Sequence, residues 1–367
     1  MPITQSNVAE TDSIRIKRSI KVASVDSYIN KHHSLCLYGL AAIAMVYHHL
    51  FCIPERLHGY WISIPMLLGI NIEITIAWYC KVCVAVFAFL SGYGFVHYAE
   101  KKWNHTINIE LMKSFWYSRV RKFYPKFWFI AAVFLTYGVL SNKIVINPSS
   151  IITTALGLST QFNGEWWYIK QYLVLVVLFP ALYLLLHKTD GNHHLPIRLF
   201  LAITLAYIAS KLLNAQFYYC LIFIEGIAVA QYRLFDRAAQ YIQKTRQARL
   251  INITLLVGTF IIRTALASEA SSSFPDLIII APFIFSVVSL LGTKKNRVLT
   301  LFGNHSTALW LSHTFLIYYY FQPIILIPKY SVLIFIWALL LSLAVSTLLD
   351  ISYGRLSGIL NEIRLHK

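Results

Sequence analysis

Charged residues are scarce in this sequence of 367 residues: Asp, Glu, Lys and Arg make up only 13% of it, about half the share of an ordinary soluble domain. Hydrophobic residues make up 57%. A soluble chain of this length needs far more polar surface, so the composition excludes an ordinary soluble domain and favours lipid as the surrounding solvent. Acidic residues are the scarcest, with 15 Asp and Glu against 32 Lys and Arg. The basic residues form short clusters between apolar runs, which is typical of cytoplasmic loops and not of nucleic-acid-binding surfaces.

Cysteines are also few, and several common motifs are missing. The five cysteines have no regular spacing, which argues against a disulfide framework. Cys80 and Cys83 form a CxxC pair inside an apolar run, where ordinary packing is the better interpretation. The sequence has no GxxxxGKS loop, no GxGxxG followed by an acid and no HExxH, and we expect no metal site. Residues 1–33 lack the basic start and apolar centre of a cleaved signal peptide and are expected to form a cytoplasmic tail.

Apolar runs long enough to cross a bilayer recur along the rest of the chain, since a spanning helix needs about 20 residues. The sequence predicts an all-α, polytopic bundle of about ten transmembrane helices over residues 34–350, followed by a cytoplasmic tail over 351–367. A further apolar stretch, 57–72, is broken by Gly and Pro and is expected to be interfacial or re-entrant. The ten predicted spans are 34–53, 74–98, 123–140, 166–187, 197–213, 217–232, 250–267, 276–292, 298–321 and 331–349.

The distribution of Lys and Arg predicts the orientation. With the N-terminus in the cytoplasm, the inner segments hold 24 of these residues and the outer loops hold three. This asymmetry follows the positive-inside rule and places both termini in the cytoplasm. The two halves of the chain show no repeat and no Gly/Pro-broken helices at matching positions, which weakens a secondary-transporter interpretation.

Two histidines near the outer end of the first span are the first candidate site. Tyr38 and His49 are eleven residues apart, about three helical turns, and therefore share one helix face, whereas His48 lies about a quarter turn away. A neutral histidine in an apolar site is a good general base because its pKa is near the working pH. The alternative is an interfacial pair that is hydrogen-bonded to its neighbours.

A basic run follows at the cytoplasmic mouth of the third span. Arg119 and Lys122 are three residues apart and share a helix face, while Arg121 points away from it. The pair is suited to the phosphates of a cytosolic cofactor, since Arg makes paired contacts to phosphate and Lys acts as a point charge. The alternative is simple positive-inside anchoring.

Four basic residues map to the outer parts of apolar spans. Each of them alone can extend its charged end to the outer interface. Together they indicate a polar cavity that is open to the outside and suited to an anionic acceptor, with Glu225 as a plausible counter-charge. The four residues are Lys81, Lys170, Lys211 and Arg263.

Two further segments carry aromatic and polar side chains. Glu165, Trp166 and Trp167 lie at the outer mouth of the fourth span, where they form either an interfacial aromatic belt or a platform for a sugar ring. In the ninth span, His313 either lines a cavity or packs in the core. Ser306 lies between two histidines, but no acidic partner has the context of a nucleophile elbow, so a hydrolase is disfavoured.

Taken together, the sequence resembles the acyltransferase 3 family, membrane O-acyltransferases that decorate bacterial polysaccharides and other envelope glycans. The resemblance covers residues 34–349, and the family's landmarks occur in the family's order. They are Gly39-Leu-Ala-Ala followed by His49, Phe89-Leu-Ser-Gly92-Tyr-Gly94-Phe95, Arg119 to Pro125 with Trp128, Trp167-Tyr168 through Phe179-Pro180, and Leu301-Phe-Gly303 through Leu311-Ser-His313.

The chain departs from the family pattern at three places. The basic residue expected eleven positions before His49 is Tyr38, so Lys81 or another basic group folded beside it would have to replace it. The second basic position of the RxxR motif is Lys122, which keeps the charge and loses the bidentate fork. Gln171 and Tyr172 stand where some members carry an acidic pair.

The resemblance implies transfer of an acyl group, expected to be acetyl, from acyl-CoA on the cytoplasmic side to a glycan hydroxyl on the outer side of a bacterial plasma membrane. His49 would deprotonate the acceptor hydroxyl or carry the acyl group itself. Arg119, Lys122 and Arg121 would hold the phosphates of CoA. The candidate acceptor-binding residues are Tyr38, Lys81, Glu165, Trp166, Trp167, Lys170, Arg263 and His313.

Two other functions remain open at this point. A transporter or flippase for an anionic or glycan substrate explains the cations within the spans and the polar cavity, but it does not explain a cytoplasmic phosphate site. A receptor or regulatory membrane protein with vestigial catalytic groups is kept open by Tyr38. An acyl-CoA transfer or hydrolysis assay separates these alternatives.

Overall fold

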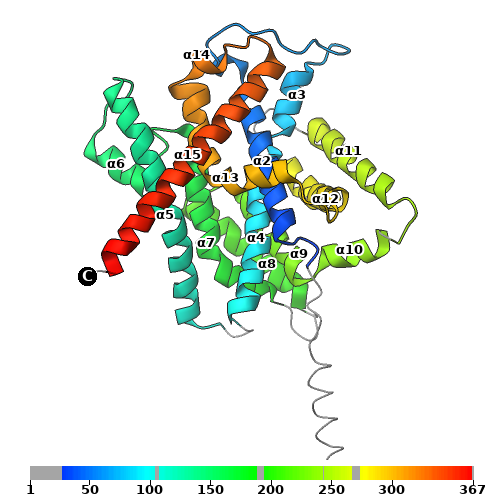
Figure 1. Ribbon diagram of the computed structural model, residues 1–367. Helices are drawn as coiled ribbons and strands as arrows, with labels where there is room; N and C mark the ends of the chain where they lie inside the picture. The colour runs from blue at the N-terminus through cyan, green and yellow to red at the C-terminus, as the bar shows by residue number, and fades with distance from the viewer. Residues whose placement is uncertain (1–26, 104–106, 188–193, 243, 267–272, 366–367) are drawn as a thin grey trace, which may run out of the picture.

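The computed structural model describes residues 27–103, 107–187, 194–242, 244–266 and 273–365. These residues form helices joined by short connections, with isolated β-bridges and no strand among them, so the predicted all-α fold is confirmed. Helix α2 runs through the middle of the bundle beside α13 and α4, with α5 and α15 on one side and α11 and α12 on the other (Figure 1). The predicted N-terminal tail lies mostly outside the described residues.

The helices follow the order of the predicted spans. They are α2 (Lys31–Phe51), α3 (Ile72–Tyr79), α4 (Val82–Trp103), α5 (Ile109–Leu140), α6 (Pro148–Ala155), α7 (Trp167–Leu186), α8 (Leu195–Leu212), α9 (Phe217–Gln231), α10 (Leu234–Ile242), α11 (Ala248–Leu266), α12 (Phe274–Leu291), α13 (Arg297–Thr314), α14 (Gln322–Ile325) and α15 (Ser331–Leu365). Three short elements complete them: the 3₁₀ turns η1 (Pro54–Arg56) and η2 (Gly164–Trp166), and the π-helical turn η4 (Phe315–Tyr319).

Eight helical segments of the described chain are long and apolar enough to cross a membrane. The protein is therefore a multi-pass membrane protein, and the predicted number of ten is not confirmed. The sixth predicted span is α9, which has only 15 residues. The ninth contains α13, which is long enough to cross a membrane. It carries Asn304, His305 and His313 and is therefore too polar to count among the eight apolar segments.

Three segments differ in extent from the prediction. The second span is interrupted between Tyr79 and Val82, which separates α3 from α4. Residues 57–71 form an irregular connection with exposed apolar side chains such as Leu68. Helix α15 continues from the last predicted span to Leu365, through most of the expected C-terminal tail, because no proline interrupts residues 331–365.

Two glycines set the contact between α2 and α13. A Cβ atom on Gly39 would lie 2.0 Å from the carbonyl oxygen of Leu299, and a Cβ on Gly303 would lie 2.0 Å from that of Leu35. The two backbones are thus in direct contact, which only glycine allows. This contact fixes α2, and with it His49, against the helix that carries His313.

The same reciprocal arrangement joins α4 to α9. A Cβ on Gly92 would lie 2.2 Å from the carbonyl oxygen of Phe223, and a Cβ on Gly226 would lie 2.2 Å from that of Phe89. The glycine of the predicted FxLSG landmark is therefore a packing residue. Small residues at such crossings are the usual means of close helix association in a membrane.

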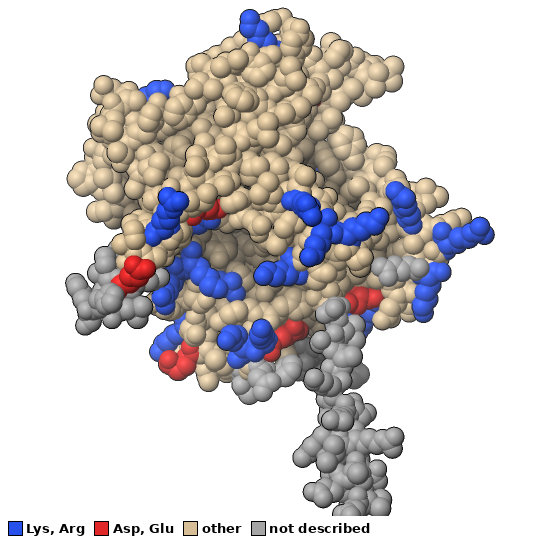
Figure 2. All heavy atoms as spheres, viewed as in Figure 1, with Lys and Arg blue, Asp and Glu red and all other residues tan. Residues whose placement is uncertain are grey.

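Lys and Arg side chains gather across the lower half of the molecule in Figure 2, around a hollow in the surface. The connection between α4 and α5 lies in this half, and Lys101 and Lys102 occupy the last turn of α4. We call this half the basic end. Helix α2 begins toward the basic end, so His48 and His49 in its last turn lie toward the opposite end.

Candidate active site

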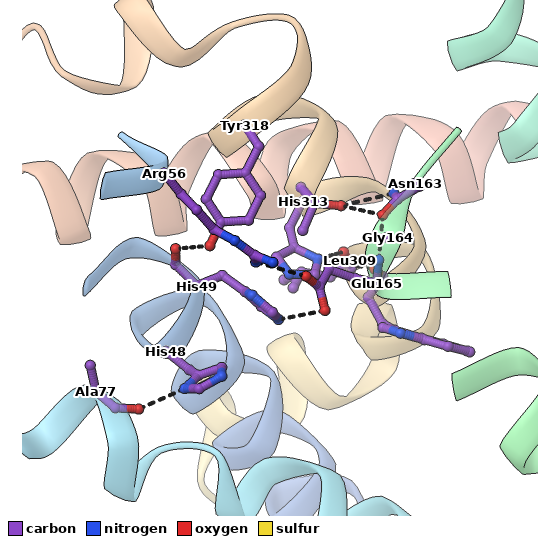
Figure 3. A network of polar contacts seen from close by, with 12 residues as sticks. His48, His49, Arg56, Ala77, Asn163, Gly164, Glu165, Leu309, His313 and Tyr318 are labelled. Atoms are coloured by element: carbon purple, nitrogen blue, oxygen red, sulfur yellow. Dashed lines mark hydrogen bonds and ion pairs between the residues drawn. The ribbon is translucent and has the colours of Figure 1, made fainter. Parts of the chain in front are cut away.

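His49 lies against a carboxylate that comes from another helix. The His49 ring is buried at the end of α2, and its Nε2 is 3.7 Å from Oε2 of Glu165 (Figure 3). Glu165 belongs to η2, which leads into α7. On its other oxygen, Glu165 accepts a hydrogen bond of 3.1 Å from the guanidinium of Arg56. The carboxylate therefore joins the imidazole to a fixed cation.

Further hydrogen bonds and a cation–ring contact hold His49, Arg56 and Glu165 in place. The hydroxyl of Tyr318 donates a hydrogen bond to the carbonyl oxygen of His49, and the Arg56 guanidinium lies 5.3 Å from the centre of the Tyr318 ring. Asn163 accepts a hydrogen bond of 3.0 Å from the backbone N–H of Glu165, and its side-chain amide donates to the Thr314 hydroxyl at 2.8 Å. These bonds attach η2 to the end of α13 and so fix the position of the carboxylate.

His313 is the second histidine of the site. Its ring centre is 5.0 Å from that of His49. Its Nδ1 lies 3.0 Å from the carbonyl oxygen of Leu309 and 2.9 Å from that of Trp310, which assigns the proton to Nδ1 and leaves a lone pair on Nε2. Within the described residues, Nε2 of His313 and Nδ1 of His49 are buried and have no hydrogen-bond partner. The pair thus retains ring nitrogens for a reacting group.

His48 has a different environment although it is the neighbour of His49. Its Nδ1 lies 2.8 Å from the carbonyl oxygen of Ala77, and its ring packs edge-on against Trp78 at 5.5 Å. These contacts connect α2 to α3. The structure therefore gives His48 a structural contact, and it gives His49 the contact with a carboxylate.

A cavity of about 340 Å³ opens beside these residues, and we call it the histidine cavity. Its lining combines the histidines with charged groups and a large aromatic wall. The lining residues are Met45, His48, His49, Cys52, Ile53, Arg56, Trp78, Lys81, Cys83, Val84, Phe87, Glu165, Trp167, Tyr168, Gln216, Tyr219 and Trp310.

A second cavity of about 280 Å³ adjoins it, and we call it the tyrosine cavity. Its wall includes Tyr38, which precedes His49 by eleven residues on α2 and so lies about 16 Å nearer the basic end, at 1.5 Å per residue. The residues that line both cavities are Phe87, Tyr168 and Trp310. The remaining lining residues are Ser91, Phe123, Tyr172, Ser306 and Thr307.

Arg119 lies beside the tyrosine cavity and not on the open surface. Its guanidinium carbon is 4.6 Å from the ring centre of Phe95, and it is similarly close to Tyr98 and Phe115. The Phe95 ring in turn lies edge-on to Tyr172, which lines the cavity, with the ring centres 6.5 Å apart. Arg119 is therefore a basic group close to the cavity that Tyr38 lines.

The other two basic residues of the run, Arg121 and Lys122, have exposed side chains. They lie on α5 in the first half of the helix, which begins at the basic end. Of the three cations, Arg119 is thus half-buried among aromatic rings, and Arg121 and Lys122 lie on the surface.

The candidate acceptor-binding residues fall into two groups. Lys81 and Trp167 line the histidine cavity together with Glu165. Trp166 is buried, and its indole N–H donates to the carbonyl oxygen of Leu311 at 3.0 Å, so it packs in the core. Lys170 is half-buried on α7 and is not among the lining residues of either cavity.

Arg263 is a core residue whose partner differs from the predicted one. Its Nε donates to Oδ1 of Asp276 at 2.7 Å, and both side chains are buried. A second guanidinium nitrogen donates to the carbonyl oxygen of Trp78. Arg263 therefore ties α11 to α12 and α3, and the counter-charge is Asp276 and not Glu225. Sequence reasoning missed Asp276 because this acid stands at the very edge of a predicted span.

Sequence reasoning also missed Arg56 as a site residue. The charge distribution places Arg56 in an outer loop, whereas the structure shows that its guanidinium binds Glu165 in the site. The only signal in the sequence is its position seven residues after His49, just beyond the end of the helix. Sequence alone does not show that the turn η1 brings it back toward the cavity.

The chain matches the model of a known protein family. The family model for the acyltransferase domain of the acyltransferase 3 family matches residues 36–351, nearly the whole chain. No curated protein and no solved structure matches the chain. The matched region begins in α2, includes both cavities and the His49–Glu165 contact, and ends in α15. The chain therefore belongs to the acyltransferase 3 family.

Proposed function

We propose that this protein transfers an acetyl group from acetyl-CoA to a hydroxyl group of an envelope glycan, across the plasma membrane of a bacterium. The basic end faces the cytoplasm, and the histidine cavity receives the acceptor from the outer side. The observation that carries the proposal is the contact of His49 with Glu165 in a cavity that shares its wall with a second cavity nearer the basic end.

The reaction is a direct acyl transfer with His49 as general base. The acceptor oxygen attacks the thioester carbonyl carbon while its proton passes to a ring nitrogen of His49. Glu165, 3.7 Å away, stabilises the imidazolium that forms, and Arg56 holds this carboxylate in position. As the new C–O bond is completed, the C–S bond breaks, and the imidazolium returns its proton to the leaving thiolate of CoA.

The donor occupies the tyrosine cavity from the cytoplasmic side. Lys122 and Arg121 on the surface, and the half-buried Arg119, attract the phosphates of CoA. The acyl-bearing arm extends past Tyr38 and Tyr172 toward His49. In this arrangement Arg119, close to the cavity that Tyr38 lines, supplies positive charge in place of the family's cation in the first helix.

The acceptor occupies the histidine cavity. Trp78 and Trp167 offer aromatic faces that suit the apolar face of a sugar ring. Lys81, at the break between α3 and α4, adds a donor for the hydroxyl or acidic groups of a glycan. The acceptor and the donor thereby approach His49 from opposite ends of the bundle.

The proposal is tested on purified protein in lipid nanodiscs. We expect the wild-type protein to release CoA from acetyl-CoA faster in the presence of an acceptor glycan, and mass spectrometry to show an added acetyl group on that glycan. Comparing envelope glycans from cells with and without the protein identifies the natural acceptor. Glycan movement across the bilayer without CoA release would instead identify a flippase and overturn the proposal.

A further inference from the structure

Tyr168 occupies the boundary between the two cavities. It is one of the three residues that line both of them. Its ring packs edge-on against Trp167 at 5.5 Å and against Trp310 at 5.7 Å. These aromatic neighbours fix the ring at the boundary of the two cavities.

The hydroxyl of Tyr168 is buried, and its oxygen has no hydrogen-bond partner in the described part of the chain. Neighbouring tyrosines of the site differ in this respect: the Tyr219 hydroxyl is bonded to Ser273 at 3.0 Å, and the Tyr318 hydroxyl donates to His49. A buried polar group without a partner destabilises the fold, because it has lost its hydrogen bonds to water. Such a group at a cavity wall indicates that a ligand atom completes its hydrogen bond.

The reaction supplies an atom of the right kind. When the acceptor oxygen attacks the thioester, the carbonyl oxygen acquires negative charge and needs a hydrogen-bond donor that is already in place. Of the three residues that line both cavities, Phe87 has no donor, whereas Tyr168 has a phenolic O–H and Trp310 has an indole N–H. The O–H of Tyr168 is the one that is buried without a partner among the described residues, and the Arg56 guanidinium is engaged with Glu165. Tyr168 combines a donor, a fixed ring and a place at the boundary.

We propose that Tyr168 is a catalytic residue whose phenolic O–H donates a hydrogen bond to the thioester carbonyl oxygen as that oxygen becomes an oxyanion. Tyr168 keeps its proton throughout. The bond that forms joins the acceptor oxygen to the carbonyl carbon, the bond that breaks joins this carbon to sulfur, and the proton moves through His49. This inference rests on the proposed acyl transfer.

The test is Tyr168→Phe, which removes the hydroxyl and keeps the ring. We expect kcat for acetyl transfer to fall about 10²- to 10³-fold, as for the loss of one oxyanion donor, with the KM for acetyl-CoA nearly unchanged. Thermal stability in nanodiscs should be unchanged or higher, because the variant loses an unpartnered buried hydroxyl.

Tyr320→Phe is the matched control. Tyr320 is 6% exposed and Tyr168 is 7% exposed, and the Tyr320 hydroxyl likewise has no partner among the described residues. Tyr320 lies outside both cavities. We therefore expect Tyr320→Phe to keep the kcat of the wild-type protein.

The outcomes distinguish the acetyl transfer itself from the role of Tyr168 in it. A wild-type protein without acetyl transfer would overturn the proposed function itself. An active wild-type protein with a fully active Tyr168→Phe variant would overturn the oxyanion role alone. A Tyr168→Phe variant that is strongly destabilised would also overturn it, since the hydroxyl would then be bonded within the fold and not reserved for the substrate.

Discussion

The Glu165 carboxylate lies 3.7 Å from Nε2 of His49, although the two residues come from different helices and the carboxylate is also bound by Arg56. This relationship distinguishes His49 from His48, whose Nδ1 is occupied by the carbonyl oxygen of Ala77. It turns a pair of adjacent histidines into one candidate base and one packing residue.

We expect His49→Ala to insert normally and to lose catalysis, with a fall in kcat of about 10²- to 10⁴-fold, because the general base is removed. His48→Ala should have a much milder effect, since it removes a hydrogen bond and a ring contact between α2 and α3 but no contact with Glu165. Steady-state rates on equal amounts of correctly inserted protein measure both. Equal losses from the two substitutions would show that the histidines act jointly or that the wrong one has been chosen.

Glu165→Gln should lower kcat by about 10- to 150-fold, since a charge-assisted interaction contributes about 1.5–3 kcal/mol and 1.4 kcal/mol corresponds to a factor of ten. The KM for acetyl-CoA should stay the same because Glu165 lies in the histidine cavity. Glu55→Gln is the control: this exposed carboxylate is on η1, next to Arg56. A Glu165→Gln variant with the wild-type rate would remove the carboxylate from the mechanism.

The double substitution Arg119→Gln/Lys122→Gln should raise the apparent KM for acetyl-CoA steeply, by about 10- to 150-fold for each cation–phosphate interaction that it removes. The acceptor KM should hardly change, and Lys122→Arg should be tolerated. Arg119→Gln alone should have the larger effect of the two single changes, because Arg119 is half-buried against Phe95, whose ring contacts Tyr172 of the tyrosine cavity.

The control for these charges is Lys101→Gln/Lys102→Gln, which removes two exposed cations from the end of α4. It should leave the donor KM unchanged. If Arg119 and Lys122 served only as anchors, their substitution would reduce insertion or alter topology and leave the kinetics of the inserted protein normal.

Gly303→Ala should destabilise the bundle by about 1–3 kcal/mol, the usual cost of overpacking, because its Cβ would meet the backbone of α2. Thermal unfolding in nanodiscs measures the effect. Gly258→Ala on α11 is the control, since a Cβ there has no neighbour within 4 Å. Equal stability of the two variants would show that the close contact of α2 and α13 is not needed.

Topology reporters provide a separate check. Fusions within 99–122 and 233–249 should report the cytoplasm, and fusions within 141–165 should report the outside, as the excess of Lys and Arg in the expected inner segments predicts. An outside location for 99–122 would also remove the proposed cytosolic site for CoA phosphates.

Several features were predictable because they are local. The apolar runs indicated the helices, the scarcity of charge indicated the membrane, and the spacing of Tyr38 and His49 placed both on one face of a helix. Both residues do line adjoining cavities. The predicted number of ten spans is not confirmed, because α9 is short and α13 is polar inside the bundle.

The pairing of distant residues was not predictable. A single sequence shows that Arg263 needs a counter-charge, but several acids are available, and only the packing of α11 on α12 selects Asp276. In the same way, Trp166 and Trp167 are adjacent in a helix-opening turn, yet one is buried in the core and the other lines the histidine cavity.

The sequence by itself therefore determined the membrane class, the all-α fold and the family, since these follow from composition, from the apolar runs of single helices and from short motifs in a fixed order. The tertiary structure decided which groups surround that histidine. Glu165, Arg56, His313 and Tyr168 meet at the site because glycine contacts bring α2 against α13 and because η1 and η2 turn toward the same cavity. The physical reason is that a helix period is a property of neighbouring residues, whereas a contact between helices depends on the shape of both surfaces.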